Sequence, residues 1–150
     1  MPATRNTPVV YIVDDEASVR KGLTRLMRSA GMPCRDFASA AQFLAEMDPR
    51  QAGCILLDIT MPHVSGLQLQ VELKQRKINL PIIAVSARDD ADTSNQARQL
   101  GARFFLRKPV DDQALLDAIR WYWRMNATSQ PKPQNENENQ QPPTDRACLR

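Results

Sequence analysis

Short apolar runs alternate with longer amphipathic segments between residues 9 and 125. Three of the runs are apolar almost throughout, which is typical of parallel strands that are covered on both faces. Their length and their β-branched and aromatic content predict strands. The five predicted strands are VVYIV (9–13), CRDFA (34–38), CILLD (54–58), PIIAVS (81–86) and RFFLR (103–107).

The segments between the strands predict helices. Gly31 is well placed to end the first, and Ser39 with Gln42 forms a capping-box pattern at the start of the second. Residues 90–100 contain few large apolar side chains, so this helix is expected to be weakly packed and able to move. The apolar positions at helical spacing are Val19, Leu23, Leu26, Met27 and Ala30, then Phe43 and Leu44, then Val64, Leu67 and Val71, and, in a last helix over 111–125, Leu115, Leu116, Ile119 and Tyr122.

Five strands that alternate with five helices predict an α/β fold: a doubly wound, three-layer sandwich around a five-stranded parallel sheet. Parallel strands need crossover connections, and these are right-handed. In such folds the ligand site lies beyond the carboxyl ends of the strands, near the point where strand order reverses. The residues that follow each strand are therefore expected to decide function.

The size and composition of the chain predict one compact domain. It has 150 residues with an apolar fraction of 42%, and residues 8–125 carry the alternating pattern. Residues 1–7 are expected to be a flexible N-terminus. Residues 126–150 are rich in Pro, Asn and Gln with almost no large apolar residue, which predicts a disordered low-complexity tail or a linker. No run is long enough for a membrane span or a signal peptide, so a cytoplasmic protein without membrane contact is expected.

Cysteine content and charge add little chemistry. Cys34, Cys54 and Cys148 have no metal-like spacing, which predicts two small core residues and one tail thiol. The net charge is +3 and the sequence pI about 9.0. A basic cluster on the first predicted helix is more typical of a solvated or protein-docking face, so no direct nucleic-acid binding is expected. The cluster contains Arg20, Lys21, Arg25 and Arg28.

Polar and charged residues stand at the ends of the first, third, fourth and fifth predicted strands. The set is Asp14, Asp15 and Glu16 after the first strand, Asp58 at the end of the third, Ser86 and Ala87 at the fourth, and Lys108 with Pro109 after the fifth. The carboxylates of Asp14, Asp15 and Asp58 should repel one another unless a cation lies between them, and hard oxygen ligands favour Mg²⁺. With an ammonium and a hydroxyl beside them, they could stabilise the charge of a transferring phosphoryl group. Each residue alone could be a helix cap or a surface charge. The evidence for a phosphoryl-transfer site is that all of them stand at the ends of successive strands.

Four motifs in order resemble those of a response-regulator receiver domain of two-component systems. They are VDDE (13–16), DITMPHVSG (58–66), VSA (85–87) and FLRKP (105–109). The resemblance covers about residues 8–125 and implies the flavodoxin-like (βα)5 receiver fold. DFASAAQFL (36–44) and GLQLQ (66–70) also resemble the FixJ-type branch, whose members usually continue into a helix-turn-helix domain. No such domain follows residue 125 in this sequence, so we expect a receiver without an output domain in this chain.

The resemblance implies that Asp58 accepts a phosphoryl group from a sensor histidine kinase or a histidine phosphotransfer protein. Asp15, Asp58 and the backbone carbonyl of Thr60 would hold Mg²⁺, with Asp14 acting through water. Lys108 would bind one phosphoryl oxygen, and the Ser86 hydroxyl would move to bond another.

Further positions are implied to govern signalling. Phe105 would rotate in the switch and act only by packing, since it has no hydroxyl. Thr60, Ala87 and Arg88 flank the pocket, where Thr60 and Arg88 would tune how long the phosphorylated state lasts. The output face would comprise residues 90–100, 103–107 and 111–125; it would bind an unknown output protein or form a homodimer. By family analogy, kinase choice would lie around Leu23, Met27 and nearby basic residues of the first helix.

Two other side-chain types have structural interpretations first. His63, in the turn after Asp58, is expected to be exposed and without a chemical role. Trp121 and Trp123 are two positions apart on a helix and cannot both face the core, so one is expected at the rim, either at an interface or packed under the tail.

Three other functions fit parts of the pattern. A phosphohydrolase of the haloacid dehalogenase type needs a second Asp two residues after the nucleophile, and Thr60 occupies that place. A phosphorylation-independent interaction module is disfavoured because all five pocket residues are retained. The chain could instead be the receiver part of a DNA-binding transcription regulator, with residues 126–150 as its linker. A signalling domain that catalyses only its own phosphorylation and dephosphorylation is the leading expectation.

Overall fold

The computed structural model describes residues 7–60, 66–87 and 91–129. Within these ranges strands and helices alternate as the sequence predicts, and the helix expected to be weak is present. In chain order the elements are β1 (Val9–Val13), α2 (Ala17–Ser29), β2 (Cys34–Phe37), α3 (Ala40–Glu46), β3 (Gly53–Asp58), α4 (Gly66–Gln75), β4 (Ile82–Ser86), α5 (Ala91–Gln99), β5 (Ala102–Arg107) and α6 (Asp112–Ser129).

The strands form one parallel sheet in the order β2-β1-β3-β4-β5. The chain runs outward from β1 to β2 and then crosses back to β3 on the other side of β1, so strand order reverses between β1 and β3. The crevice beyond the carboxyl ends of these two strands is where an open α/β sheet binds ligands. The predicted doubly wound α/β sandwich is confirmed.

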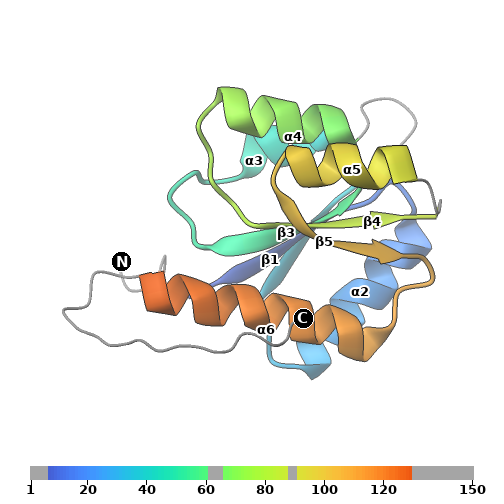
Figure 1. Cartoon of the computed structure of the whole chain (residues 1–150). Helices are drawn as coiled ribbons and strands as arrows, with labels where there is room; N and C mark the ends of the chain where they lie inside the picture. Colours follow the sequence, from blue (N-terminus) through green and yellow to red (C-terminus); the bar gives the residue numbers. More distant parts are fainter. Residues whose placement is uncertain (1–6, 61–65, 88–90, 130–150) are drawn as a thin grey trace, which may run out of the picture.

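Helices cover both faces of the sheet (Figure 1): α3, α4 and α5 lie on one face, and α2 and α6 on the other. Each face has its own buried core, because successive residues of a strand point to opposite sides. Leu57 packs with Phe43 and Leu69 on the first face, and Leu56 packs with Met27 and Ile119 on the second. The central strands β1, β3 and β4 are buried along almost their whole length, which fixes the residues at their ends firmly in place.

The predicted helix ends of α2 and α3 are confirmed. Gly31 has a positive φ of 72° just after α2, a conformation that glycine adopts without strain. The Gln42 amide donates to Ser39 Oγ at 3.1 Å, which caps α3. The Gln42 side chain in turn accepts from the Ala38 amide at 3.1 Å, so both partners of the capping pattern are used.

The helix predicted from Val64, Leu67 and Val71 is present as α4. Leu67 packs half-buried against the core and Val71 is exposed, while the buried positions include Leu69, Leu73 and Gln70. Gln70 is fully buried because its Nε2 donates to the Ala97 carbonyl of α5 at 3.0 Å. A polar residue thus takes a core position, which hydropathy alone assigns to solvent. Val64 lies outside the described residues.

The last helix is longer than predicted. It ends at Ser129 rather than at residue 125, so the first four residues of the predicted tail are helical. Its buried side is confirmed for Leu115, Ile119 and Tyr122, while Leu116 is half-buried. Residues 130–150 lie outside the described part.

Tyr122 joins α6 to an irregularity in the sheet. The register between β4 and β5 shifts at Ile82 and Ile83, and Arg103 is the extra residue. The Tyr122 hydroxyl donates to the Ile82 carbonyl at 2.7 Å and accepts from the Arg103 amide at 3.1 Å. Both backbone groups are therefore satisfied by a side chain instead of by each other, and burial raises the pKa of Tyr122 to about 12.

The two tryptophans flank Tyr122, and both are half-buried against the core, so both of them, and not one alone, lie at its rim. Trp121 packs edge-on against Phe104 with ring centroids 5.4 Å apart, and the Arg103 guanidinium lies 5.3 Å from its ring centroid. Trp123 packs against the core between α2 and α6. Successive helix positions turn by about 100°, so residues on either side of a buried tyrosine each reach the edge of the core.

Two further expectations concern cysteines and membranes. Cys54 is fully buried and Cys34 half-buried, and both are free thiols in the core, as predicted; Cys148 lies outside the described residues. Among the described helices, none is both long and apolar enough to cross a bilayer.

Candidate functional site

Asp58 ends the buried strand β3 and is itself 4% exposed. Its Oδ1 accepts two hydrogen bonds from Thr60, from the amide at 2.9 Å and from Oγ1 at 2.8 Å. The start of α4 lies close against the end of the strand: a Cβ at Gly66 would lie 2.5 Å from Ile59 Cα and 2.7 Å from the Asp58 carbonyl oxygen. Only glycine lets α4 begin this close to the strand, so the carboxylate is held between a rigid strand and a packed helix start.

Asp14 follows β1, the neighbouring strand, and is 3% exposed. Its amide donates to the Phe37 carbonyl of β2 at 3.1 Å, and its Oδ1 accepts from the Glu16 amide at 2.9 Å. Burial raises the pKa of the Asp14 carboxyl, and the nearby Asp58 charge adds to the rise, while the bonds from Glu16 and Lys108 oppose it. Asp15, the next residue, is exposed.

Lys108 reaches across the sheet to both buried carboxylates. Its Nζ lies 3.0 Å from Asp14 Oδ2, 3.3 Å from Asp58 Oδ2 and 3.4 Å from Glu16 Oε1. Burial alone would lower the pKa of Lys108, but the carboxylates of Asp14 and Asp58 outweigh this and raise it. The Lys108 amide donates to the Ser86 carbonyl at 2.8 Å, which ties the residue to the end of β4. The ammonium is therefore held charged, next to Asp58.

Three carboxylates form a possible cation site. Oxygen atoms of Asp14, Asp15 and Asp58 all lie within 4.8 Å of one another. A single ammonium shared with Glu16 offsets only part of this negative charge. Within the described ranges, the Asp15 side chain has no hydrogen-bonded or ion-paired partner. An all-oxygen cluster with one free carboxylate is suited to a hard divalent cation such as Mg²⁺.

The other predicted pocket residues differ from one another in their exposure to solvent. Ser86 is fully buried at the end of β4, whereas Ala87 is exposed. Phe105 on β5 is half-buried and packs against the core on the α3–α5 side. Thr60 is exposed but bonded to Asp58 through its own side chain. Arg88 and His63 lie outside the described residues.

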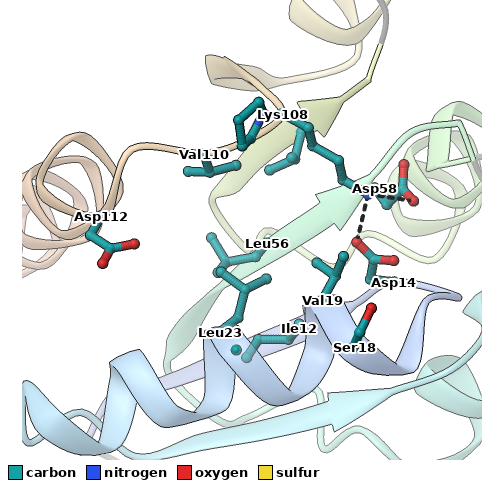
Figure 2. A pocket seen from close by; sticks show the side chains of 13 residues that line it. Ile12, Asp14, Ser18, Val19, Leu23, Leu56, Asp58, Lys108, Val110 and Asp112 are labelled. Atoms are coloured by element: carbon teal, nitrogen blue, oxygen red, sulfur yellow. Dashed lines mark hydrogen bonds and ion pairs between the residues drawn. The ribbon is translucent and has the colours of Figure 1, made fainter.

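A cleft runs from this cluster between α2 and the segment that joins β5 to α6 (Figure 2). Asp14, Asp58 and Lys108 lie at one end of it, and its walls are mainly aliphatic. Met27 is fully buried in the core and offers no surface to a partner, while Leu23 lines the cleft; the region expected to choose the kinase stays a prediction. The aliphatic lining comprises Ile12, Val19, Leu23, Leu56, Val85 and Val110.

Sequence reasoning missed two contacts. Glu16 was expected only as part of the acidic run, yet it reaches Lys108. Arg20 was assigned to a basic helix face, yet its guanidinium binds the backbone beside the cluster: Nη1 donates to the Asp14 carbonyl at 2.7 Å. Its place in the first turn of a helix that follows a charged loop was the signal that could have indicated this.

Residues 10–120 match the family model described as response regulator receiver domain. The chain belongs to this family. Receiver domains take phosphoryl groups from histidine kinases; they are signalling domains of two-component systems and not, in general, enzymes. This receiver domain resembles several FixJ-type proteins of bacteria.

Transcriptional regulatory protein TdiR of Thauera aromatica is 45% identical over 135 residues, which are 90% of this chain and 59% of that protein. Nodulation protein W of Bradyrhizobium diazoefficiens is 40% identical over 111 residues, 74% of this chain and 49% of that protein. The chain thus spans about half to three-fifths of the length of these relatives.

Solved structures show the same fold. The response regulator StyR superposes with a TM-score of 0.76 and 43% identity, over 81% of this chain and 62% of that one. The structure named FixJ-N gives a TM-score of 0.71 and 34% identity, over 75% of this chain and 90% of that one. The predicted FixJ-type receiver resemblance is confirmed.

Proposed function

We propose that this receiver domain is a phosphorylation-dependent switch with Asp58 as the phosphoacceptor. The observation that carries the proposal is the pairing of a buried carboxylate with an ammonium 3.3 Å away, at the point where strand order reverses. Asp58 Oδ1 is occupied by Thr60, whereas Oδ2 faces Lys108 and the cleft. Oδ2 is therefore the nucleophile that we assign. The phosphodonor is a histidine of a sensor kinase or of a phosphotransfer protein.

The proposed metal ligands are Asp15, Asp58 and the backbone carbonyl of Thr60, with Asp14 acting through water. The carboxylate cluster supports this choice, since three carboxylates lie close together and the single Lys108 ammonium offsets only part of their charge. Bound Mg²⁺ would supply positive charge to the phosphoryl oxygens and to the attacking carboxylate.

The transfer itself asks little of the protein besides position and charge. Asp58 Oδ2 forms a bond to phosphorus while the bond from phosphorus to the donor imidazole nitrogen breaks, and the electron pair of that bond stays with the imidazole. Lys108 then exchanges part of its contact with Asp14 and Asp58 for a phosphoryl oxygen. Because Lys108 is already charged and in place, no proton needs to move.

The new dianionic group at Asp58 would change the packing of nearby elements. Ser86 is buried at the end of β4 beside β5, so movement of its hydroxyl toward a phosphoryl oxygen would leave room for Phe105 to rotate. We infer that the signal leaves through α5, β5 and α6, to an unknown output protein or a second copy. Helix α5 buries only Ala97, so it is less firmly anchored than α6, which buries four of its described residues: Leu115, Ala118, Ile119 and Tyr122.

Phosphorylation by acetyl phosphate or phosphoramidate tests the proposal. Intact-protein mass spectrometry should show one added phosphoryl group with Mg²⁺ and none after chelation. An Asp58→Asn protein should stay unlabelled, and Asp15→Asn should label far more slowly. Equal labelling of Asp58→Asn would exclude Asp58 as the acceptor.

A second candidate function is the receiver part of a DNA-binding transcription regulator. The relatives support it: TdiR is named a transcriptional regulatory protein and extends well beyond the matched region, and NtrC of Escherichia coli is named a DNA-binding transcriptional regulator. The genomic reading frame around this sequence tests the idea. A helix-turn-helix coding region in frame after residue 150 would support it, and a stop codon there would contradict it.

A further inference from the structure

Arg20 lies beside the acidic cluster but contacts none of its carboxylates. Its side chain is 17% exposed, much less than expected for a residue of a solvated basic face. It begins one turn into α2, where its own amide donates to the Glu16 carbonyl at 3.0 Å. The guanidinium then turns back toward β1 and β2 rather than out to solvent.

The guanidinium makes two contacts with different strands. Nη1 donates to the Asp14 backbone carbonyl at 2.7 Å, and Nε donates to Asp36 Oδ2 at 3.2 Å. Asp36 lies on β2, directly beside Ile12 of β1. Arg20 therefore connects the start of α2, the end of β1 and the edge strand β2. The guanidinium holds these two donors in a rigid planar fork, whereas a lysine would place a compact ammonium on a flexible stem.

These contacts complete the fixation of Asp14. Its amide is bonded to Phe37, its carbonyl to Arg20, and its two carboxylate oxygens to Glu16 and Lys108. The Asp14 carbonyl belongs to the peptide unit that leads into Asp15. The orientation of this carbonyl therefore sets the orientation of the peptide plane before Asp15. This in turn determines the direction in which the exposed Asp15 side chain leaves the backbone.

We propose that Arg20, held by Asp36, is a positioning residue for the magnesium site: it fixes the peptide unit between Asp14 and Asp15 so that the Asp15 carboxylate stays near Asp58. This inference rests on the proposed function, since it concerns the same cation site. Loss of groups that orient metal ligands costs about 10–100-fold in metal affinity. Arg20 touches no ligand side chain and acts only through the backbone.

The sign of the effect separates positioning from simple charge. Arg20 is a cation close to the place of a second cation, so by charge alone its removal should strengthen Mg²⁺ binding. Positioning predicts the opposite. Arg25 offers a matched control, because it is an exposed arginine on the same helix.

The experiment is a Mg²⁺ titration of the full chain, followed by NMR at the amides of Asp14, Asp15 and Thr60. Arg20→Ala should bind Mg²⁺ about 10-fold more weakly than the wild type. Arg20→Lys should not restore the affinity, because a flexible ammonium lacks the fixed planar geometry of the guanidinium donors. Arg25→Ala should bind as the wild type does. Equal or tighter binding by Arg20→Ala, or full rescue by lysine, would overturn the inference.

Asp36→Asn keeps the test decisive if Arg20→Ala does not fold. It leaves Arg20 in place but removes its anchor, and it should weaken Mg²⁺ binding even at about 0.5 M NaCl, where interactions between exposed charges are screened. A loss of Mg²⁺ affinity that disappears at high salt would show that Asp36 acts only through its charge, and it would overturn the inference. A wild-type protein that binds no Mg²⁺ would instead remove the proposed function and the inference with it.

Discussion

Lys108 Nζ lies 3.3 Å from Asp58 Oδ2, although the two residues are 50 positions apart and follow strands separated by β4. The same ammonium lies 3.0 Å from Asp14 Oδ2. One cation therefore offsets part of the charge of two buried carboxylates, and it lies next to the atom that we assign as the nucleophile.

Lys108→Met should reduce stability most strongly when Mg²⁺ is absent. The substitution leaves Asp14 and Asp58 buried without their shared cation, and it should lower the free energy of unfolding by roughly 2 kcal/mol. Added Mg²⁺ should recover much of this loss, since a bound cation replaces the missing charge. Urea unfolding with and without Mg²⁺ measures both effects. A deficit that Mg²⁺ does not reduce would show that Lys108 stabilises the fold by packing alone.

Gly66→Ala should destabilise the protein by at least about 2 kcal/mol, because the new Cβ would meet backbone atoms that cannot move without shifting Asp58. It should also slow phosphorylation of Asp58. Gly22→Ala is the matched control: a Cβ at this position of α2 meets nothing within 4 Å. In a helix that change should stabilise by about 0.5–1 kcal/mol. Thermal unfolding of the pair would refute the close-packing argument if both variants changed stability in the same direction.

Tyr122→Phe should lower the free energy of unfolding by about 1–3 kcal/mol near neutral pH, because the Ile82 carbonyl and the Arg103 amide lose a buried partner. The pKa of Tyr122 is raised to about 12, so the folded state favours the neutral phenol. Its contribution is fully present below the unfolded value of 10.0 and is lost as the pH rises toward 12.

The stability difference between wild type and Tyr122→Phe should therefore shrink between pH 10.0 and about 12. Denaturant unfolding of both proteins across this window measures it. The comparison cancels the other tyrosine, Tyr11, whose pKa burial also raises. A difference that stays constant up to pH 12 would mean that the hydroxyl does not bridge β4 and β5.

Much of the fold could be predicted from short-range pattern. Apolar runs identified β1, β3 and β4 because strands buried on both faces need no polar alternation. Gly31 and Ser39 fixed two helix ends because their roles are local. The burial of Gln70 in α4 could not be predicted, because it depends on a hydrogen bond to Ala97, 27 residues further along the chain, which hydropathy cannot indicate.

The site likewise has features that could be predicted from sequence and features that could not. Asp14, Asp58 and Lys108 could be predicted to meet, because parallel strands bring their carboxyl ends to one edge. The contacts of Arg20 could not, since they depend on the direction in which a side chain leaves its helix. The bulge at Arg103 also required the structure, because it depends on a hydroxyl from α6.

Location of the phosphoryl group tests the central claim most directly. The wild-type protein would be phosphorylated with a small phosphodonor and Mg²⁺, reduced with borohydride to convert the acyl phosphate into a stable alcohol, digested and sequenced by mass spectrometry. We predict homoserine at position 58 and at no other aspartate. Reduction at Asp14 or Asp15, or an unmodified Asp58 in protein that has gained a phosphoryl group, would contradict the account.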